Sequence, residues 1–267
     1  MRRERNRWLT GYAIAVYAFL FAPIVILILF SFNESKRNFA WKGFTLDWYP
    51  TLLGDQDVLE ALSVTLRVGI VAVIGATILG TLLGLGLTRL KRSARGSTET
   101  LLLLPMVTPE IVMGLSLLLF FAQLFGGKGS FAQIAIAHIT FCISYVAIVV
   151  RARAAGLDPQ LEEAGRDLGA SAWGAFRYVT LPLLLPAIAA GAMLSFALSF
   201  DDLIVTSFNA GAVGSNTLPL FIYSKIRFGV TPEINAISTI IVAITAILIL
   251  VAWRLGGLRG KDRPIEG

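Results

Sequence analysis

The chain has 267 residues, of which 56% are hydrophobic and only 15% charged, and its mean hydropathy is +0.75. This composition excludes an ordinary soluble domain of the same size and places the chain in a lipid bilayer. The net charge of +6 comes from short basic groups beside apolar segments, which is typical of membrane topology and argues against nucleic-acid binding. One cysteine and one histidine are too few for a disulfide framework or a structural zinc site, so no metal or cofactor is expected.

Six apolar segments are long enough to cross a hydrocarbon core about 30 Å thick. The first follows the basic start MRRERNRW and precedes no small-residue cleavage site, so it is interpreted as an uncleaved span. The sequence predicts an all-α, polytopic membrane protein, with a transmembrane domain over 11–254 between an N-terminus at 1–10 and a tail at 255–267. The six predicted spans are 11–32, 62–88, 101–125, 131–150, 186–208 and 236–253.

The distribution of Lys and Arg predicts the orientation, because positive charge next to a span is retained in the cytoplasm. With both termini in the cytoplasm, sixteen of the 23 basic residues lie inside, six lie outside and Arg67 lies within the second span. The inner residues are Arg2, Arg3, Arg5, Arg7, Arg89, Lys91, Arg92, Arg95, Arg151, Arg153, Arg166, Arg177, Arg254, Arg259, Lys261 and Arg263.

The second span carries a stripe of small residues at a spacing of three or four. Such a stripe lets helix backbones approach closely, here either within the chain or against a partner. Its members are Gly69, Ala72, Ala76, Gly80 and Gly84.

The third span contains Pro105 and Pro109, which predict a kinked or unwound helix. Glu110 follows the second proline and lies roughly 13 Å into the membrane. A carboxylate at that depth is costly unless it is paired or hydrated. Two interpretations stay open: Glu110 faces a solute path, or it pairs with a structural partner such as Arg67.

The link GGKGS over 126–130 lacks the full phosphate-binding pattern and predicts a tight turn on the outer face. In the fourth span, His138 and Cys142 lie one turn apart, and His138 is predicted to be a buried histidine with a local hydrogen-bond partner. The fifth span carries Asp201 and Asp202, roughly 22 Å along the helix from Pro186.

Successive helical residues point about 100° apart, so one of these two carboxylates is expected to face a path and the other to pair within the protein. Which of them faces the path stays open, as does a structural role for Asp201. Together with Glu110, these acids favour a cationic solute over an anion.

The longest polar interruption between spans covers residues 151–182 and predicts two short helices. Asp158 and Pro159 form a helix start, and Gly169 suits a left-handed helix end. Ser171 caps a second helix, which is expected to run to residue 178 and to stop at 181–182, where a proline stands.

The spacing of this loop resembles the cytoplasmic loop of permease subunits of ABC importers, which is Glu-Ala-Ala, three residues, Gly, nine residues, Ile-x-Leu-Pro. Gly165 stands where the family usually has Ala, and Val179 where it has Ile. The resemblance implies a type I ABC importer permease fold whose loop docks on a cytoplasmic ABC ATPase dimer. Since the chain lacks a Walker-type loop, it is expected not to be an enzyme. The docking residues implied are Glu162, Glu163, Ala164, Gly165, Asp167, Gly169, Leu181 and Pro182.

The runs 199–240 and 109–113 resemble the second permease of spermidine/putrescine importers. This resemblance implies a polyamine substrate, a path with Glu110, Asp201 and Asp202, and a multi-pass protein in the bacterial inner membrane. The partners implied are a second permease and an extracytoplasmic solute-binding protein, besides membrane lipid. Lys225 and Arg227 face either the outer surface or the docked binding protein. The alternatives are another solute (an opine, an amino-acid derivative or iron), an ion-coupled secondary transporter, and a membrane scaffold.

Overall fold

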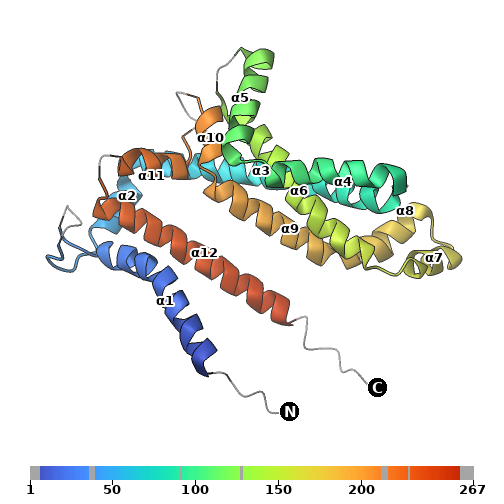
Figure 1. Cartoon of the computed structure of the whole chain (residues 1–267), viewed down its shortest axis with the longest axis horizontal. Helices are drawn as coiled ribbons and strands as arrows, with labels where there is room; N and C mark the ends of the chain where they lie inside the picture. Colours follow the sequence, from blue (N-terminus) through green and yellow to red (C-terminus); the bar gives the residue numbers. More distant parts are fainter. Residues whose placement is uncertain are drawn as a thin grey trace. The chain divides into compact units, whose positions relative to one another are not determined.

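A computed structural model describes residues 7–35, 40–90, 92–126, 129–211, 216–227 and 229–258 (Figure 1). These residues are helical, apart from turns and one isolated antiparallel bridge between Asn33 and Phe44, so the predicted all-α class is confirmed. The ends 1–6 and 259–267, on which part of the charge count depends, lie outside the described residues. The elements are α1 (Arg7–Phe30), α2 (Trp48–Gly54), α3 (Gln56–Arg89), α4 (Arg92–Val107), α5 (Glu110–Phe125), α6 (Phe131–Ala155), α7 (Gln160–Asp167), α8 (Ala172–Ala175), η1 (Phe176–Thr180), α9 (Leu181–Asp201), α10 (Ile204–Asn209), α11 (Leu218–Ile226) and α12 (Pro232–Leu258).

Four of the described helical segments are long and apolar enough to cross a membrane, namely Trp8–Phe30, Gln56–Arg89, Phe131–Ala155 and Ala172–Asp201. A fifth span results if the bent pair of α4 and α5 is counted as one. The sixth predicted span corresponds to α12, whose described apolar part, Pro232–Ile247, is shorter. The number of spans and the side of each terminus therefore stay predictions.

The chain forms two compact units, residues 1–56 with 222–267 and residues 57–221. In the first unit, α12 packs against α1 and α2. The turn after α1 is organised by Asn33, which is fully buried and whose side-chain amide donates to the Ala40 carbonyl at 2.9 Å. The Phe32 ring lies 5.4 Å from that of Phe44 and 5.5 Å from that of Tyr49, between ring centroids.

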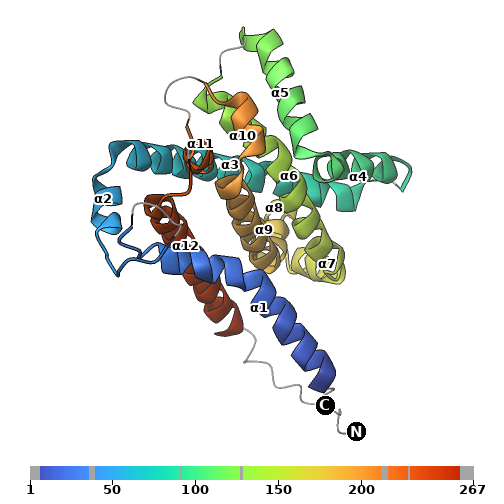
Figure 2. The same ribbon diagram turned by 60° about the vertical axis from the view of Figure 1, so that its left-hand side comes forward.

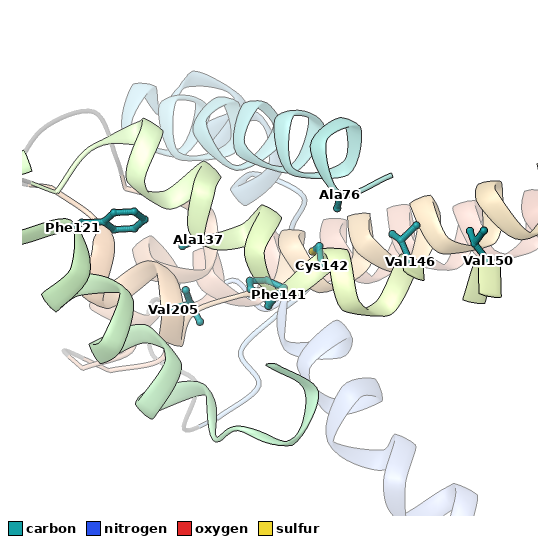
Figure 3. Close-up of a cluster of buried hydrophobic side chains, with 8 residues drawn as sticks. All are labelled: Ala76, Phe121, Ala137, Phe141, Cys142, Val146, Val150 and Val205. Carbon is teal, nitrogen blue, oxygen red and sulfur yellow. The ribbon is translucent and has the colours of Figure 1, made fainter. Parts of the chain in front are cut away.

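The second unit is built around α6, which packs against α4, α9 and α10, while α10 also packs against α5 (Figures 1 and 2). Its main core cluster draws side chains from α3, α5, α6 and α10 (Figure 3). The cluster follows one side of α6 and places His138, one turn before Cys142, among the apolar residues. Its members are Ala76, Phe121, Ala137, Phe141, Cys142, Val146, Val150 and Val205.

The small-residue stripe of α3 is buried within the same chain, where Gly69 faces α9 and Gly80 and Gly84 face α6. A Cβ atom at Gly80 would lie 2.6 Å from the Cβ of Val146, and one at Gly84 would lie 2.7 Å from the carbonyl oxygen of Ala147. The stripe therefore lets α3 and α6 approach closely. This is close packing within the chain, the first of the two roles predicted for the stripe.

Replacing Gly84 with alanine is expected to destabilise the protein by about 1–3 kcal/mol, because its Cβ would meet backbone atoms of α6 that cannot rotate away. The measurement is the thermal unfolding temperature of the detergent-purified protein. Gly86→Ala is the matched control, since nothing lies within 4 Å of its Cβ in the same helix. Equal unfolding temperatures for the two variants contradict the close contact of α3 and α6.

The third predicted span is broken, because α4 and α5 meet at an angle of 104°. The kinked or unwound helix predicted from the two prolines is confirmed, and its first part begins before residue 101, at Arg92. Pro105 lies inside α4, and the break falls at Thr108 and Pro109, since a residue before proline disfavours helical backbone. The Thr108 hydroxyl donates to the Leu104 carbonyl at 2.6 Å and so closes α4.

The prediction of one continuous helix over the fifth span, 186–208, is wrong. Helix α9 ends at Asp201, Asp202 has an extended backbone with ψ of 123°, and α10 begins at Ile204. A side-chain cap and contacts to α6, described below, stabilise this second break.

Candidate functional site

The loop between α6 and α9 has the predicted helix–glycine–helix structure. The Asp158 carboxylate accepts the N–H of Gln160 at 3.0 Å, and α7 follows Pro159. Gly169 has φ of +89°, which is the predicted left-handed helix end. The Ser171 hydroxyl accepts the N–H of Gly174 at 3.1 Å and caps α8. Local sequence chemistry thus determines the shape of this segment.

The predicted end of the second helix at Leu181 and Pro182 is wrong. Helical structure continues from α8 through the five π-helical residues of η1 into α9. Pro182 lies in the first turn of α9, where a proline ring and its missing N–H are tolerated. In this π turn the Leu181 N–H donates to the Phe176 carbonyl, and local π adjustments of this kind let a membrane helix continue through a proline.

The side chains of α7 divide into an attached face and an exposed face. Glu162 accepts a hydrogen bond from the Thr180 hydroxyl at 3.2 Å and forms an ion pair with Arg89 at 3.5 Å. Gly165 packs toward η1, since a Cβ there would lie 3.3 Å from Cγ2 of Val179. These contacts join α7 to α3 and to η1, and Figure 1 shows α7 beside α8.

The exposed face of the loop contains both charged and apolar side chains. Glu163, Ala164 and Asp167 are exposed on α7, and Leu168 is 90% exposed directly before Gly169. Trp173 and Tyr178 extend the apolar part of this surface over α8 and η1. Large exposed apolar side chains beside carboxylates are typical of a protein-binding surface.

A cavity of about 530 Å³ lies behind α7, between the ends of α3 and α6 and the start of α9. Its lining includes Leu85, Arg89, Ala155, Leu161, Glu162 and Thr180. Within the described unit, this cavity therefore separates part of α7 from the long helices α3, α6 and α9.

Basic side chains gather at the same end of the second unit. Arg151, near the end of α6, forms an ion pair with Glu99 of α4, and Arg153 donates to the Leu183 carbonyl of α9 at 3.2 Å. With the ion pair of Arg89 and Glu162, these contacts involve five helices, α3, α4, α6, α7 and α9, at the loop between α6 and α9.

Glu110 is the first residue of α5, directly after the break at Pro109, and its side chain is exposed. Arg67 is also exposed, and no ion pair joins these two described residues. A carboxylate in the first turn of a helix interacts favourably with the helix dipole. Glu110 therefore lies at the helix end next to the break. It does not form the ion pair with Arg67 that was one of its two predicted roles.

The two adjacent carboxylates of α9 lie in different environments. Asp201 is the last residue of α9 and is exposed. The Asp202 side chain is only 6% exposed and accepts the N–H of Val205 at 3.3 Å and of Thr206 at 2.7 Å. Its Oδ2 lies 3.3 Å from Nε2 of His138. Asp202 therefore pairs within the protein, as one of the two acids was expected to do.

His138 is fully buried and has hydrogen-bond partners, as predicted, but they lie on other helices. Its Nδ1 is 2.7 Å from the Ser199 hydroxyl, and its Nε2 is 3.0 Å from the Thr206 hydroxyl. Sequence reasoning missed both these partners and the partners of Glu162, since no local pattern connects residues so far apart. Among the residues that the structure describes, no group of three or more His, Cys, Asp or Glu could hold a metal ion.

Two further predicted features lie near loop ends. In the GGKGS link, Gly126 has a left-handed backbone and Ser130 caps α6 by accepting the N–H of Gln133, whereas 127–128 lie outside the described residues. Lys225 and Arg227 are both exposed at the end of α11, and the Arg227 guanidinium lies 4.9 Å from the ring centroid of Tyr223.

Comparison with known proteins agrees with the resemblance carried by the docking loop. The family of binding-protein-dependent transport system inner membrane components matches residues 76–258. The chain is 39% identical over 266 residues to the putrescine transport system permease protein PotI of Escherichia coli strain K12, covering 97% of this chain and 94% of that protein. It is also 39% identical over 242 residues to the spermidine/putrescine transport system permease protein PotC of the same strain, covering 91% of each.

Among solved structures, a bacterial alginate ABC transporter in complex with an alginate-pentasaccharide-bound periplasmic protein has the same fold. The TM-score is 0.72 at 18% identity, over 96% of this chain and 94% of that chain.

Proposed function

The chain belongs to the family of binding-protein-dependent transport system inner membrane components, and we propose that it forms half of the path through which an ABC importer carries a polyamine. It is a transport permease, not an enzyme, and the energy comes from ATP hydrolysis in a partner subunit. The observation that carries the choice of solute is the 39% identity to two polyamine permeases over at least 91% of the chain.

The proposed topology has six spans with both termini in the cytoplasm of a bacterium. The gathering of Arg89, Arg151 and Arg153 at the docking-loop end of the second unit supports this orientation, because basic residues favour the cytoplasmic side. The complex then contains a second permease, two ATPase subunits and an extracytoplasmic solute-binding protein.

In the docking loop, residues 151–182, the predicted site residues have two proposed roles. Glu163, Ala164, Asp167 and the turn at Gly169 present the surface that enters a groove of the ATPase. Glu162, Gly165, Leu181 and Pro182 hold that surface in place through α3, η1 and the first turn of α9. Movement of the ATPases then reaches the long helices through these attachments.

Glu110 and Asp201 are the carboxylates proposed to face the solute, and Asp202 is assigned to the protein interior. Both proposed path residues are exposed and stand at a helix end beside a break. Non-regular backbone at membrane depth is tolerated where it lines a cavity or is buried in protein. A polyamine carries several separated ammonium groups, and more than one carboxylate along the path suits such a solute.

Uptake and co-purification together test this proposal. The tagged chain, expressed in its native host, is expected to co-purify with an ATPase and a second permease and to support uptake of radiolabelled putrescine or spermidine. Unlabelled opines, amino-acid derivatives and ferric iron are the competitors. Competition by one of these, but not by polyamines, contradicts the solute, and uptake without the ATPase favours an ion-coupled transporter.

A further inference from the structure

We infer that His138 is a positioning residue of the translocation path: it holds Asp202 inside the protein and thereby leaves Asp201 as the carboxylate exposed to the solute. The role of Asp201 rests on the proposed function, whereas the arrangement around His138 rests on the structure. His138 is 0% exposed, and neither ATPase docking nor solute contact requires a histidine at that place. Its hydrogen-bond partners lie on two other helices, α9 and α10, and its Nε2 also lies 3.3 Å from Asp202 between them.

The hydrogen bonds around His138 can all be satisfied with one neutral tautomer. The Thr206 hydroxyl donates to Oδ2 of Asp202 at 2.8 Å, so its oxygen is free to accept from Nε2–H of His138 at 3.0 Å. Nδ1 then accepts from the Ser199 hydroxyl at 2.7 Å. Fully satisfied buried networks of this kind fix one arrangement of the helices that contribute to them.

The network lies at the break between α9 and α10. Asp202 leaves the helix and caps α10 with both carboxylate oxygens, and His138 of α6 holds the same carboxylate from the other side. Ser199 fixes the last turn of α9 to the imidazole as well. Backbone groups freed by a break inside a membrane need partners within the protein, and this cluster supplies them.

Loss of the imidazole removes the N–H that Nε2 presents to the Thr206 hydroxyl at 3.0 Å and, at 3.3 Å, to the almost completely buried carboxylate of Asp202. A buried charge without its partner is costly, so Asp202 is expected to move toward water and to displace the end of α9. Asp201 precedes it directly in the chain and moves with it. His138 thus acts on the solute through the position of Asp201, without contact of its own.

The first test needs no solute and measures the position of residue 201. In the assembled importer with Cys142→Ala, Asp201→Cys supplies the thiol, and its labelling rate with a membrane-impermeant maleimide is measured. Adding His138→Leu is expected to change this rate at least about threefold, as expected for a shifted conformational population. His138→Gln keeps a side-chain N–H and is expected to restore the rate.

Val146→Ala is the matched control, because Val146 is fully buried in α6 but lies outside the network. It is expected to lower the unfolding temperature and to leave the labelling rate unchanged. A labelling rate that is the same with His138 and with leucine overturns the inference, as does an equal change in Val146→Ala.

The second test measures polyamine uptake with the native Asp201. His138→Leu is expected to raise the KM at least about fivefold with a smaller change in maximal rate, and to have no further effect on KM in an Asp201→Asn background. Additive effects of the two substitutions overturn the inference. If the parent importer takes up neither polyamine, the proposed function fails, and the labelling test alone decides on His138.

Discussion

Replacing Gly169 with valine is expected to lower ATP-driven uptake at least about tenfold while the permease still reaches the membrane. Gly169 has φ of +89°, a backbone conformation that costs an L-residue with a side chain about 1–2 kcal/mol and a β-branched one more. Nothing lies within 4 Å of its Cβ position, so the effect comes from the backbone and not from a clash. The turn must change, and with it the docking surface formed by α7 and α8.

Two substitutions separate this effect from a general intolerance of the loop. Gly169→Asn is expected to keep most of the uptake, because asparagine tolerates a left-handed backbone. Gly156→Ala is the second control, since Gly156 has an ordinary φ of −94° in the same loop. The measurements are uptake and the amount of ATPase that co-purifies. Unchanged uptake and assembly with valine at residue 169 contradict the docking role.

Asp201→Asn is expected to raise the KM for polyamine uptake at least about fivefold without loss of the assembled complex. A carboxylate and an ammonium 4 Å apart attract by about 1 kcal/mol in water and by about 4 kcal/mol at an effective dielectric constant of 20. The exposed position of Asp201 places the interaction between these limits. Uptake kinetics, with membrane protein levels as the reference, measure the effect.

The neighbouring substitution Asp202→Asn provides the comparison, because it removes the same charge from the adjacent position. Its amide replaces a carboxylate that accepts three hydrogen bonds and contacts His138, so stability is expected to fall more than solute affinity. Equal KM values for wild type and Asp201→Asn, with a raised KM for Asp202→Asn, reverse the assignment of the two acids.

The features that could be predicted from the sequence depend on residues close together in the chain. The Asp158 start, the left-handed Gly169 and the Ser171 cap each act within a few residues, and all three have the expected geometry. The stripe on α3 was predictable for a similar reason, because its spacing marks one face of a helix. The kink near Pro109 follows from the backbone chemistry of proline itself.

The features that could not be predicted depend on contacts between distant residues. The partners of His138 lie 61 and 68 residues further along the chain, and no local pattern indicates them. The break after Asp201 follows from those contacts, because only in the folded unit is Asp202 held between α6 and α10. The helix through Pro182 was missed because a local π turn, η1, lets the helix continue through the proline.

The proposed function requires this permease to couple ATP hydrolysis in a partner to polyamine import. The direct measurement uses the purified complex in proteoliposomes, with ATP inside, binding protein outside and radiolabelled putrescine or spermidine as solute. We expect accumulation that requires ATP and the binding protein and that Gly169→Val lowers at least about tenfold. Accumulation that continues without ATP, or ATP hydrolysis with no accumulation of either polyamine, contradicts this function.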